Sequence, residues 1–215
     1  METAQNGSHA GGVTRMASRS IDFFDSQFRR QVAERDFALN PFEQLALEYV
    51  SGTILDLACG LGNLSLEACR RGCRVVAVDG SETAIARIQA AALEEKLQVE
   101  AVLIDLASYR IDRRYDAIVA IGLLMFFRKE RALALLEDIQ AHVTLGGRAI
   151  VNVLIEGTTF LDMFEPGSYY LFGHDELALR FAGWKLLLSR HDTFSAPRST
   201  VKEFATLIAE KGATG

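Results

Sequence analysis

The chain has 215 residues, of which 49% are hydrophobic and 24% are charged, and its formal net charge is −5 at pH 7. This length suits a single α/β domain with a full hydrophobic core and a short additional segment. The acidic balance disfavours a nucleic-acid partner, because proteins that bind nucleic acid usually carry a basic surface. No apolar run reaches the length of about 18 residues that a membrane span needs, so we expect no membrane partner.

The cysteines are Cys59, Cys69 and Cys73. Their odd number, without the spacing of a disulfide framework, indicates reduced thiols. The N-terminus shows no charged-then-apolar leader pattern, and together these features predict a cytoplasmic protein. Cys69 and Cys73 lie on one expected helix and could share a metal ion, but no histidine or cysteine partner follows at ligand spacing. We therefore expect small buried side chains and no metal site.

Three stretches are predicted from composition along the chain. Residues 1–16 are small, polar and rich in glycine, and we expect them to be disordered. Residues 17–50 are predicted to form an N-terminal helical cap, with one helix over 20–38 and a second that Pro41 begins after a break at Asn40. The remaining residues, 51–215, are predicted to form the main domain.

The first expected helix carries a stripe of phenylalanines, Phe23, Phe24 and Phe28. Such a stripe at helical spacing fits ordinary core packing. It also fits a helix that covers a bound cofactor, and the sequence leaves both interpretations open.

The main domain alternates apolar strands with helices. The expected strands cover residues 53–58, 74–79, 98–104, 115–121, 148–155, 184–190 and about 201–210, and the expected helices cover residues 62–71, 81–95, 129–143 and 174–182. This order predicts a doubly wound, Rossmann-like α/β sheet that is mostly parallel. The last two strands are joined by a short loop, which predicts an antiparallel hairpin at one edge.

Three consecutive strands each end in an acid: Asp56, Asp79 and Asp105. The carboxyl ends of parallel strands meet at one edge of the sheet, where open α/β folds bind ligands. Unpaired carboxylates there lower stability, which favours a ligand-binding role. We expect Asp56 to attract an ammonium group, Asp79 to accept from ribose hydroxyls, and Asp105 to accept from an adenine amino group. That set fits S-adenosylmethionine.

The turn after the first strand contains Gly60 and Gly62, which allow the backbone to approach a ligand closely. Nicotinamide-dinucleotide sites use Gly-x-Gly-x-x-Gly, and Ser65 stands here in place of the third glycine. Asp56 would also repel a pyrophosphate, so a dinucleotide enzyme is a distant alternative. The predicted cofactor-binding residues are Asp56, Ala58, Cys59, Gly60, Gly62, Asn63, Asp79, Gly80, Ser81, Asp105, Leu106 and Ile121.

The motif Asp-x-Ala-Cys-Gly-x-Gly-Asn at 56–63, together with Asp79 and Asp105, resembles the class I S-adenosylmethionine-dependent methyltransferases over residues 50–211. The resemblance implies a seven-stranded sheet whose last strand is antiparallel, with S-adenosylmethionine as cofactor and S-adenosylhomocysteine as product. The C-terminal half is similar to the TehB-like tellurite-resistance methyltransferases. That likeness rests on Leu124-Met125-Phe126, Asp175-Glu176-Leu177, Gly183-Trp184 and the stretch 204–209.

In the TehB-like family, a His-Arg pair and a further Arg in a C-terminal loop are implicated in catalysis. Here His191 supplies the histidine, Asp192 stands where the paired Arg would follow, and Arg198 falls near the position of the further Arg. The resemblance therefore implies catalytic roles for His191 and Arg198. His174 is a second candidate base, or a capping residue of the helix that follows it.

Two segments are candidates for the acceptor side: the apolar stretch 121–127, and residues 156–175, which are long enough to form a lid. We expect methyl transfer to a small-molecule acceptor, namely a metalloid oxyanion, a thiol or a small metabolite. The alternative is a non-catalytic S-adenosylmethionine-binding sensor or partner protein. A nucleic-acid or protein methyltransferase is disfavoured, because Ile121-Gly122-Leu123-Leu124 replaces the Asn-Pro-Pro-Tyr-type loop. The sequence indicates no oligomeric state.

Overall fold

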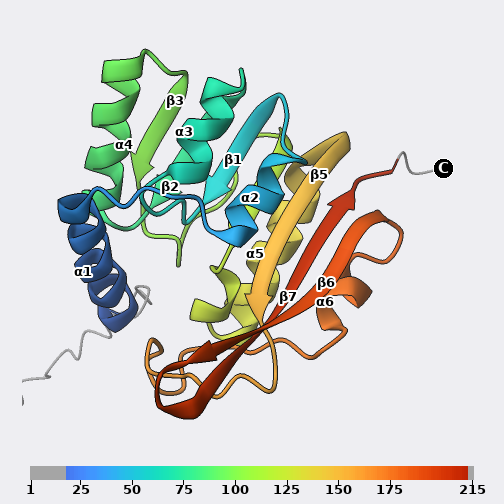
Figure 1. Cartoon of the computed structure of the whole chain (residues 1–215). Coiled ribbons are helices and arrows are strands. Elements are labelled where there is room, and N and C mark those ends of the chain that lie inside the picture. Colours follow the sequence, from blue (N-terminus) through green and yellow to red (C-terminus); the bar gives the residue numbers. More distant parts are fainter. Residues whose placement is uncertain (1–17, 213–215) are drawn as a thin grey trace, which may run out of the picture.

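Seven strands form one mixed sheet in the order β3-β2-β1-β4-β5-β7-β6 (Figure 1). The computed structural model describes residues 18–212, so the predicted disorder of residues 1–16 lies outside the described residues. The strands are β1 (Thr53–Leu57), β2 (Arg74–Asp79), β3 (Val99–Leu103), β4 (Tyr115–Ile121), β5 (Val143–Leu154), β6 (Lys185–Ala196) and β7 (Thr200–Glu210). The α-helices are α1 (Ser18–Glu34), α2 (Pro41–Leu47), α3 (Asn63–Arg70), α4 (Glu82–Glu95), α5 (Lys129–His142) and α6 (Glu176–Arg180).

The predicted doubly wound sheet with an antiparallel last strand is confirmed. Neighbours among β1 to β5 pair in parallel, whereas β7 pairs antiparallel with both β5 and β6. In Figure 1 the parallel strands point downward and β7 points upward. Because β7 runs antiparallel to β5, its first residues lie at the edge of the sheet where the parallel strands end.

The sheet has a hydrophobic core on each face, which follows from the alternation of side chains along each strand. In β1, Ile54 packs with the layer that includes α2, α3 and α4. The next residue, Leu55, packs with the layer that includes α5 and α6. Both faces of the sheet are therefore covered by helices, and the ligand edge lies between the two layers at the ends of the strands.

The main boundary errors of the sequence prediction concern β6 and β5. The strand expected over 184–190 continues to Ala196 as β6, because its residues pair with β7 as far as Ala196. Residues 143–147 were expected to end a helix and form a turn before a strand at 148, but β5 already begins at Val143. Val143 pairs with Tyr115, and the pairing then shifts register before Ala117. Gly146, with φ of +74°, lies in this irregular part of the strand.

Gly62 is a glycine for reasons of packing. Its φ is +72°, and a Cβ atom built on it would lie 2.4 Å from Cγ1 of Ile88, a side chain of α4 with no exposed surface. The residue lets α3 approach α4 closely. This packing contact is enough to explain a glycine at position 62, without a ligand beside it.

We predict that Gly62→Ala lowers the free energy of unfolding by about 2–4 kcal/mol, as positive-φ strain and overpacking against Ile88 add together. Gly72→Ala is the matched control, because Gly72 has φ of +91° with nothing within 4 Å of its added Cβ. That control should lose only about 1–2 kcal/mol. Equal losses in urea unfolding would contradict the packing role of Gly62.

Candidate active site

A cavity of about 610 Å³ opens at the carboxyl ends of the parallel strands. It lies at the end of the sheet that points downward in Figure 1. Of the twelve predicted cofactor-binding residues, only Gly62 and Asp105 are absent from its wall. The other ten line it, namely Asp56, Ala58, Cys59, Gly60, Asn63, Asp79, Gly80, Ser81, Leu106 and Ile121.

Asp56 is a buried carboxylate at the end of β1, with 4% of its surface exposed. Its Oδ2 accepts a hydrogen bond of 2.6 Å from the Ser65 hydroxyl. Burial raises the pKa of Asp56 to about 7, the Ser65 hydrogen bond opposes that shift, and the nearby charges of Glu43 and Asp79 add to it. A cation placed beside Asp56 would reverse the shift, so the site favours a positively charged ligand group.

Asp79, at the end of β2, holds the two turns of the site together. Its Oδ2 accepts from the Gly60 N–H at 2.9 Å, and its Oδ1 accepts from the Ser81 N–H at 2.8 Å. Burial raises the pKa of Asp79 despite these hydrogen bonds. Each carboxylate oxygen has further lone pairs, so the group can still accept from ligand hydroxyls.

The turn between β1 and α3 has several residues with positive φ. Ala58, Gly60 and Gly62 all have positive φ, at +56°, +52° and +72°. A Cβ on Gly60 would lie 3.2 Å from the Phe28 ring of α1, so this glycine faces the helix that covers the cavity. The Cys59 thiol lines the cavity, and burial raises the pKa of Cys59 well above its usual value, which makes it a poor nucleophile.

Asp105 is the predicted acid that the structure places outside the cavity wall. Its Oδ1 accepts from the Ala107 N–H at 2.9 Å, which stabilises the turn after β3. The neighbouring Leu106 does line the cavity and is 1% exposed. The adenine contact of Leu106 and the amino-group contact of Asp105 stay predictions.

Helix α1 lies across the cavity and contributes several of its apolar wall residues, Phe24 and Phe28 among them. The Phe24 ring meets the Phe126 ring edge to face at a centroid distance of 5.2 Å. The Ser81 hydroxyl donates to Asp25 at 2.8 Å, which joins α1 to the start of α4. The phenylalanine stripe thus lines the cavity, as expected for a helix that covers a bound cofactor.

Helix α2 brings a third carboxylate to the cavity, which the sequence analysis missed. Asn40 caps α2 by accepting from the N–H groups of Phe42 and Glu43, and Glu43 in turn accepts from the Asn40 N–H at 2.8 Å. Burial raises the pKa of Glu43. The capping-box pattern Asn-x-x-Glu was visible in the sequence, but it did not show that Glu43 faces Asp56.

The opposite end of the cavity is formed by residues that the sequence analysis did not single out for binding. Asn152 of β5 and both Phe204 and Lys202 of β7 line it, together with Phe160 from the segment 156–175. That segment reaches over the cavity: Met163 also lines it, and its carbonyl accepts from the Ser20 hydroxyl of α1. Its predicted lid-like position is consistent with these contacts.

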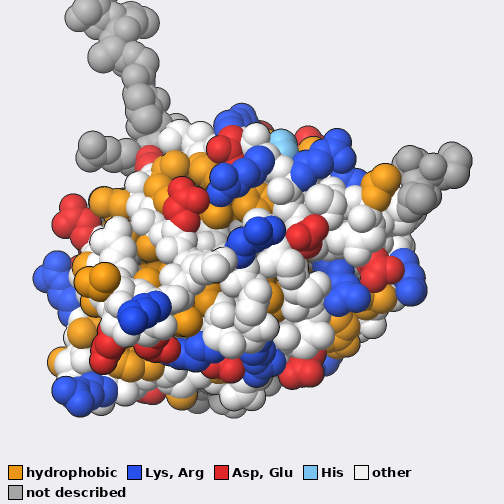
Figure 2. Space-filling model, turned by 90° about the horizontal axis from the view of Figure 1, so that it is seen from above, with side chains coloured by type: hydrophobic (Ala, Val, Ile, Leu, Met, Phe, Trp, Pro, Cys, Tyr) orange, Lys and Arg blue, Asp and Glu red, His pale blue; other side chains and the backbone are white. Residues whose placement is uncertain are grey.

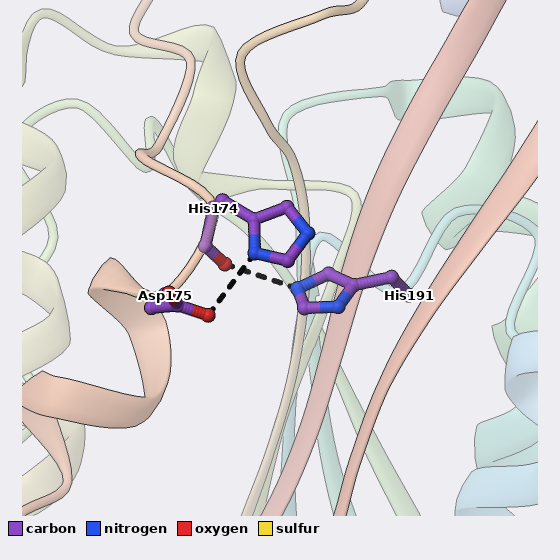
Figure 3. A group of neighbouring side chains, drawn as sticks. All are labelled: His174, Asp175 and His191. Atoms are coloured by element: carbon purple, nitrogen blue, oxygen red, sulfur yellow. Dashed lines mark hydrogen bonds and ion pairs between the residues drawn. The ribbon is translucent and has the colours of Figure 1, made fainter.

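The two candidate histidines lie together on the surface, outside the cavity wall (Figure 3). His174 and His191 have ring centroids 3.9 Å apart. His191 Nε2 contacts the His174 carbonyl oxygen at 3.0 Å, and His174 Nδ1 contacts Asp175 at 3.0 Å. A base that takes a proton from a substrate must reach it directly or through one water. Their catalytic roles stay predictions that this arrangement does not support.

The same three side chains are the one group among residues 18–212 that could offer three ligand atoms to a metal ion. All three are exposed. The expectation of no metal site stays a prediction.

Arg198 also lies outside the cavity wall, although its neighbour Pro197 is part of it. Arg198 pairs with Asp162 and has φ of +60°. Asp192, which replaces the Arg of the family pair, accepts from Arg190 at 2.8 Å on the same strand. A catalytic role for Arg198 stays a prediction that depends on a change in this ion pair.

The strand order and the position of the cavity define the class I methyltransferase fold. A family model described as "Tellurite resistance protein TehB" matches residues 38–196. The chain therefore belongs to the TehB family. The crystal structure of TehB from Haemophilus influenzae superposes with a TM-score of 0.70 at 23% identity, over 89% of this chain and 67% of that one.

Two curated relatives carry methyltransferase names. The probable S-adenosyl-L-methionine-dependent methyltransferase TehB of Haemophilus influenzae (strain 10810) is 28% identical over 165 residues, which are 74% of this chain and 57% of that protein. The cypemycin N-terminal methyltransferase of a Streptomyces species is 32% identical over 132 residues, which are 60% of this chain and 49% of that protein. The chain thus spans about half the length of these relatives.

We predict that Asp56→Asn stabilises the ligand-free protein at pH 8 by about 2–4 kcal/mol and has little effect near pH 4. The pKa of Asp56 is raised in the folded state, so the folded protein binds this proton more tightly than the unfolded chain does. Its contribution to stability is lost as pH rises from about 4 to about 7. Unfolding of both proteins at pH 4, 6 and 8 measures the difference, and a difference independent of pH would contradict the raised pKa.

Proposed function

We propose that this chain binds S-adenosylmethionine and transfers its methyl group to a small-molecule acceptor. Membership of the TehB family supports this proposal. The observation that carries it is the cavity itself, which has Asp56, Asp79 and Glu43 at one end and Gly60 of the turn after β1 in its wall. A ligand with a cationic amino-acid tail, a ribose and an adenine matches that set of groups.

The residues of this chain would share the binding as follows. Asp56 would face the ammonium group, and Asp79 would accept from the ribose hydroxyls while it keeps the two turns joined. Leu106 would pack against the adenine. The sulfonium supplies an activated methyl group when the cofactor is bound, so the protein's part is alignment and the exclusion of water by α1 and the segment 156–175.

The size and walls of the cavity favour a small acceptor. About 610 Å³ must hold both the cofactor and the acceptor, and it falls within the usual range for small-molecule sites. The candidates stay a metalloid oxyanion, a thiol or a small metabolite.

Figure 2 shows the face at the amino ends of the parallel strands, where Lys and Arg side chains are interspersed with Asp and Glu. That face offers no uniform basic field for nucleic acid.

A second candidate function is a non-catalytic protein that binds S-adenosylmethionine as a sensor or partner. One observation favours it: no histidine is among the described residues that line the cavity, so neither of the two candidate histidines stands there as a base. A thiolate or another acceptor that is already deprotonated would need no base.

Two further proposals concern the organisation of the protein. We infer that residues 17–50 act as a cap over the methyltransferase domain at 51–215, since α1 and α2 both supply cavity residues.

A cytoplasmic protein is supported by the three cysteines, which are all buried and free. No helix within residues 18–212 is both long and apolar enough to cross a bilayer.

The proposal is tested by release of S-adenosylhomocysteine with tellurite, selenite, aliphatic and aromatic thiols, and phenols, beside a titration of the cofactor alone. Turnover with at least one acceptor supports a methyltransferase. Tight cofactor binding with no turnover on any of them would favour the sensor. Absence of cofactor binding would reject both.

We predict that Asp79→Asn weakens S-adenosylhomocysteine binding tenfold or more, because hydrogen bonds to a charged acceptor contribute about 1.5–3 kcal/mol each. Asp105→Asn should lose less, because Asp105 does not line the cavity. Isothermal titration measures both, and melting temperatures show whether each variant is folded. An unchanged affinity in folded Asp79→Asn would contradict the assignment.

A further inference from the structure

The cavity has one cationic side chain among the described residues that line it, and this side chain lies away from the acids. The acids belong to β1, β2 and α2, whereas Lys202 belongs to β7. In the sheet, β4 and β5 separate β7 from β1. The cavity is therefore negative at the cofactor end and positive at the far end.

Within residues 18–212, Lys202 makes no ion pair and no side-chain hydrogen bond. Its ammonium group lies 4.7 Å from the centre of the Phe160 ring. Two acids from the neighbouring segments have other partners: Asp162 pairs with Arg198, and Glu203 accepts from the Thr193 hydroxyl. Burial lowers the pKa of Lys202, as expected for an ammonium that has lost water without gaining an anion.

A second polar group at this end also lacks a partner. Asn152 has no exposed surface, and its Nδ2 donates to the Thr206 hydroxyl at 2.9 Å. Its Oδ1 has no hydrogen-bond partner in the part of the chain that the structure describes. A buried acceptor without a partner lowers stability, by about 1–3 kcal/mol. A ligand hydroxyl would satisfy it.

The strand places these groups in a line. Lys202, Phe204 and Thr206 alternate along β7, so they share one face, and Asn152 pairs with Thr206 on β5. Asn152 and Thr206 lie at the inner end of this line, the Phe204 ring lies in the middle, and Lys202 lies toward the start of β7. An elongated molecule on this face would place one end at Asn152 and the other at Lys202.

The walls around this line are apolar. Met125, Leu154, Phe160, Met163 and Phe204 all line the cavity. Such walls suit the body of an organic molecule, whereas a small hydrated oxyanion would lose its water there and gain few donors.

We propose that Asn152, Phe204 and Lys202 form the acceptor subsite and that it takes a small organic anion, with an apolar or aromatic body, a hydroxyl at Asn152 and a carboxylate at Lys202. This inference rests on the proposed function, since it assumes that the cofactor fills the acidic end. It leaves the cofactor contacts unchanged.

The test compares two probes of equal shape and different charge. 4-Hydroxybenzoate and 4-hydroxybenzamide are titrated into the protein saturated with S-adenosylhomocysteine. The wild-type complex should bind the carboxylate at least tenfold more tightly than the amide. Lys202→Met should remove that preference without changing the amide's affinity, and Lys202→Arg should restore part of it. Selenite should compete weakly.

Lys129→Met is the matched control. Its ammonium lies 5.2 Å from the centre of the Tyr170 ring, and Lys129 does not line the cavity. It should keep the wild-type preference. Asn152→Ala should weaken both probes alike, and its melting temperature shows whether it is folded.

The inference is overturned if wild-type protein binds the two probes equally or binds neither. It is also overturned if Lys202→Met weakens both alike, or if selenite displaces 4-hydroxybenzoate readily. In each of these cases, S-adenosylhomocysteine binding and turnover on another acceptor leave the proposed function intact. Failure to bind S-adenosylhomocysteine removes the proposed function and this inference together.

Discussion

The site depends on the hydrogen bonds of one carboxylate. Asp79 accepts from Gly60 in the turn after β1 and from Ser81 in the turn after β2, so a single side chain fixes the relative position of both cofactor loops. Ser81 also donates to Asp25 of α1, which extends the same network to the helix over the cavity. These contacts join segments that are distant in the sequence, and the shape of the cofactor end follows from them.

Charge separation within the cavity gives the second constraint. Burial raises the pKa of Asp56, Asp79 and Glu43, and the nearby charges of Glu43 and Asp79 raise the pKa of Asp56 further. Such a group lowers the stability of the empty protein, which is a common property of binding sites because the ligand supplies the missing charge. At the far end, Lys202 is a cation whose pKa is lowered by burial. The cavity is thus arranged for a cationic donor at one end and an anionic acceptor at the other.

Most of the fold could be predicted because hydrophobic alternation and glycine turns are local signals. The strands that end at Asp56 and Asp79 were placed correctly, and the antiparallel β7 followed from its hairpin. The sequence did not predict that Glu43, Asn152 and Lys202 line the same cavity, because only the tertiary fold brings α2, β5 and β7 to it. The start of β5 was predicted wrongly because Gly146 was taken to mark a turn. In the structure, Val143 already pairs with Tyr115 of β4, and the strand continues through Gly146 with a shift in register.

The catalytic roles predicted for His191 and Arg198 rest on family resemblance alone and stay predictions. His191 and Arg198 match family positions in the sequence, yet the structure places His191 against His174 on the surface and pairs Arg198 with Asp162. Position along a strand does not determine whether a side chain reaches the cavity. Lys202 lies only a few residues after Arg198 and does line it, but no motif marks it.

A crystal structure of the complex with S-adenosylhomocysteine would show directly which residues of the cavity contact the cofactor. We expect the amino group beside Asp56, the ribose hydroxyls on Asp79, the adenine against Leu106, and the sulfur directed toward Asn152 and the β7 end of the cavity. A complex with the ligand outside this cavity, or with its amino group at Lys202, would contradict these assignments.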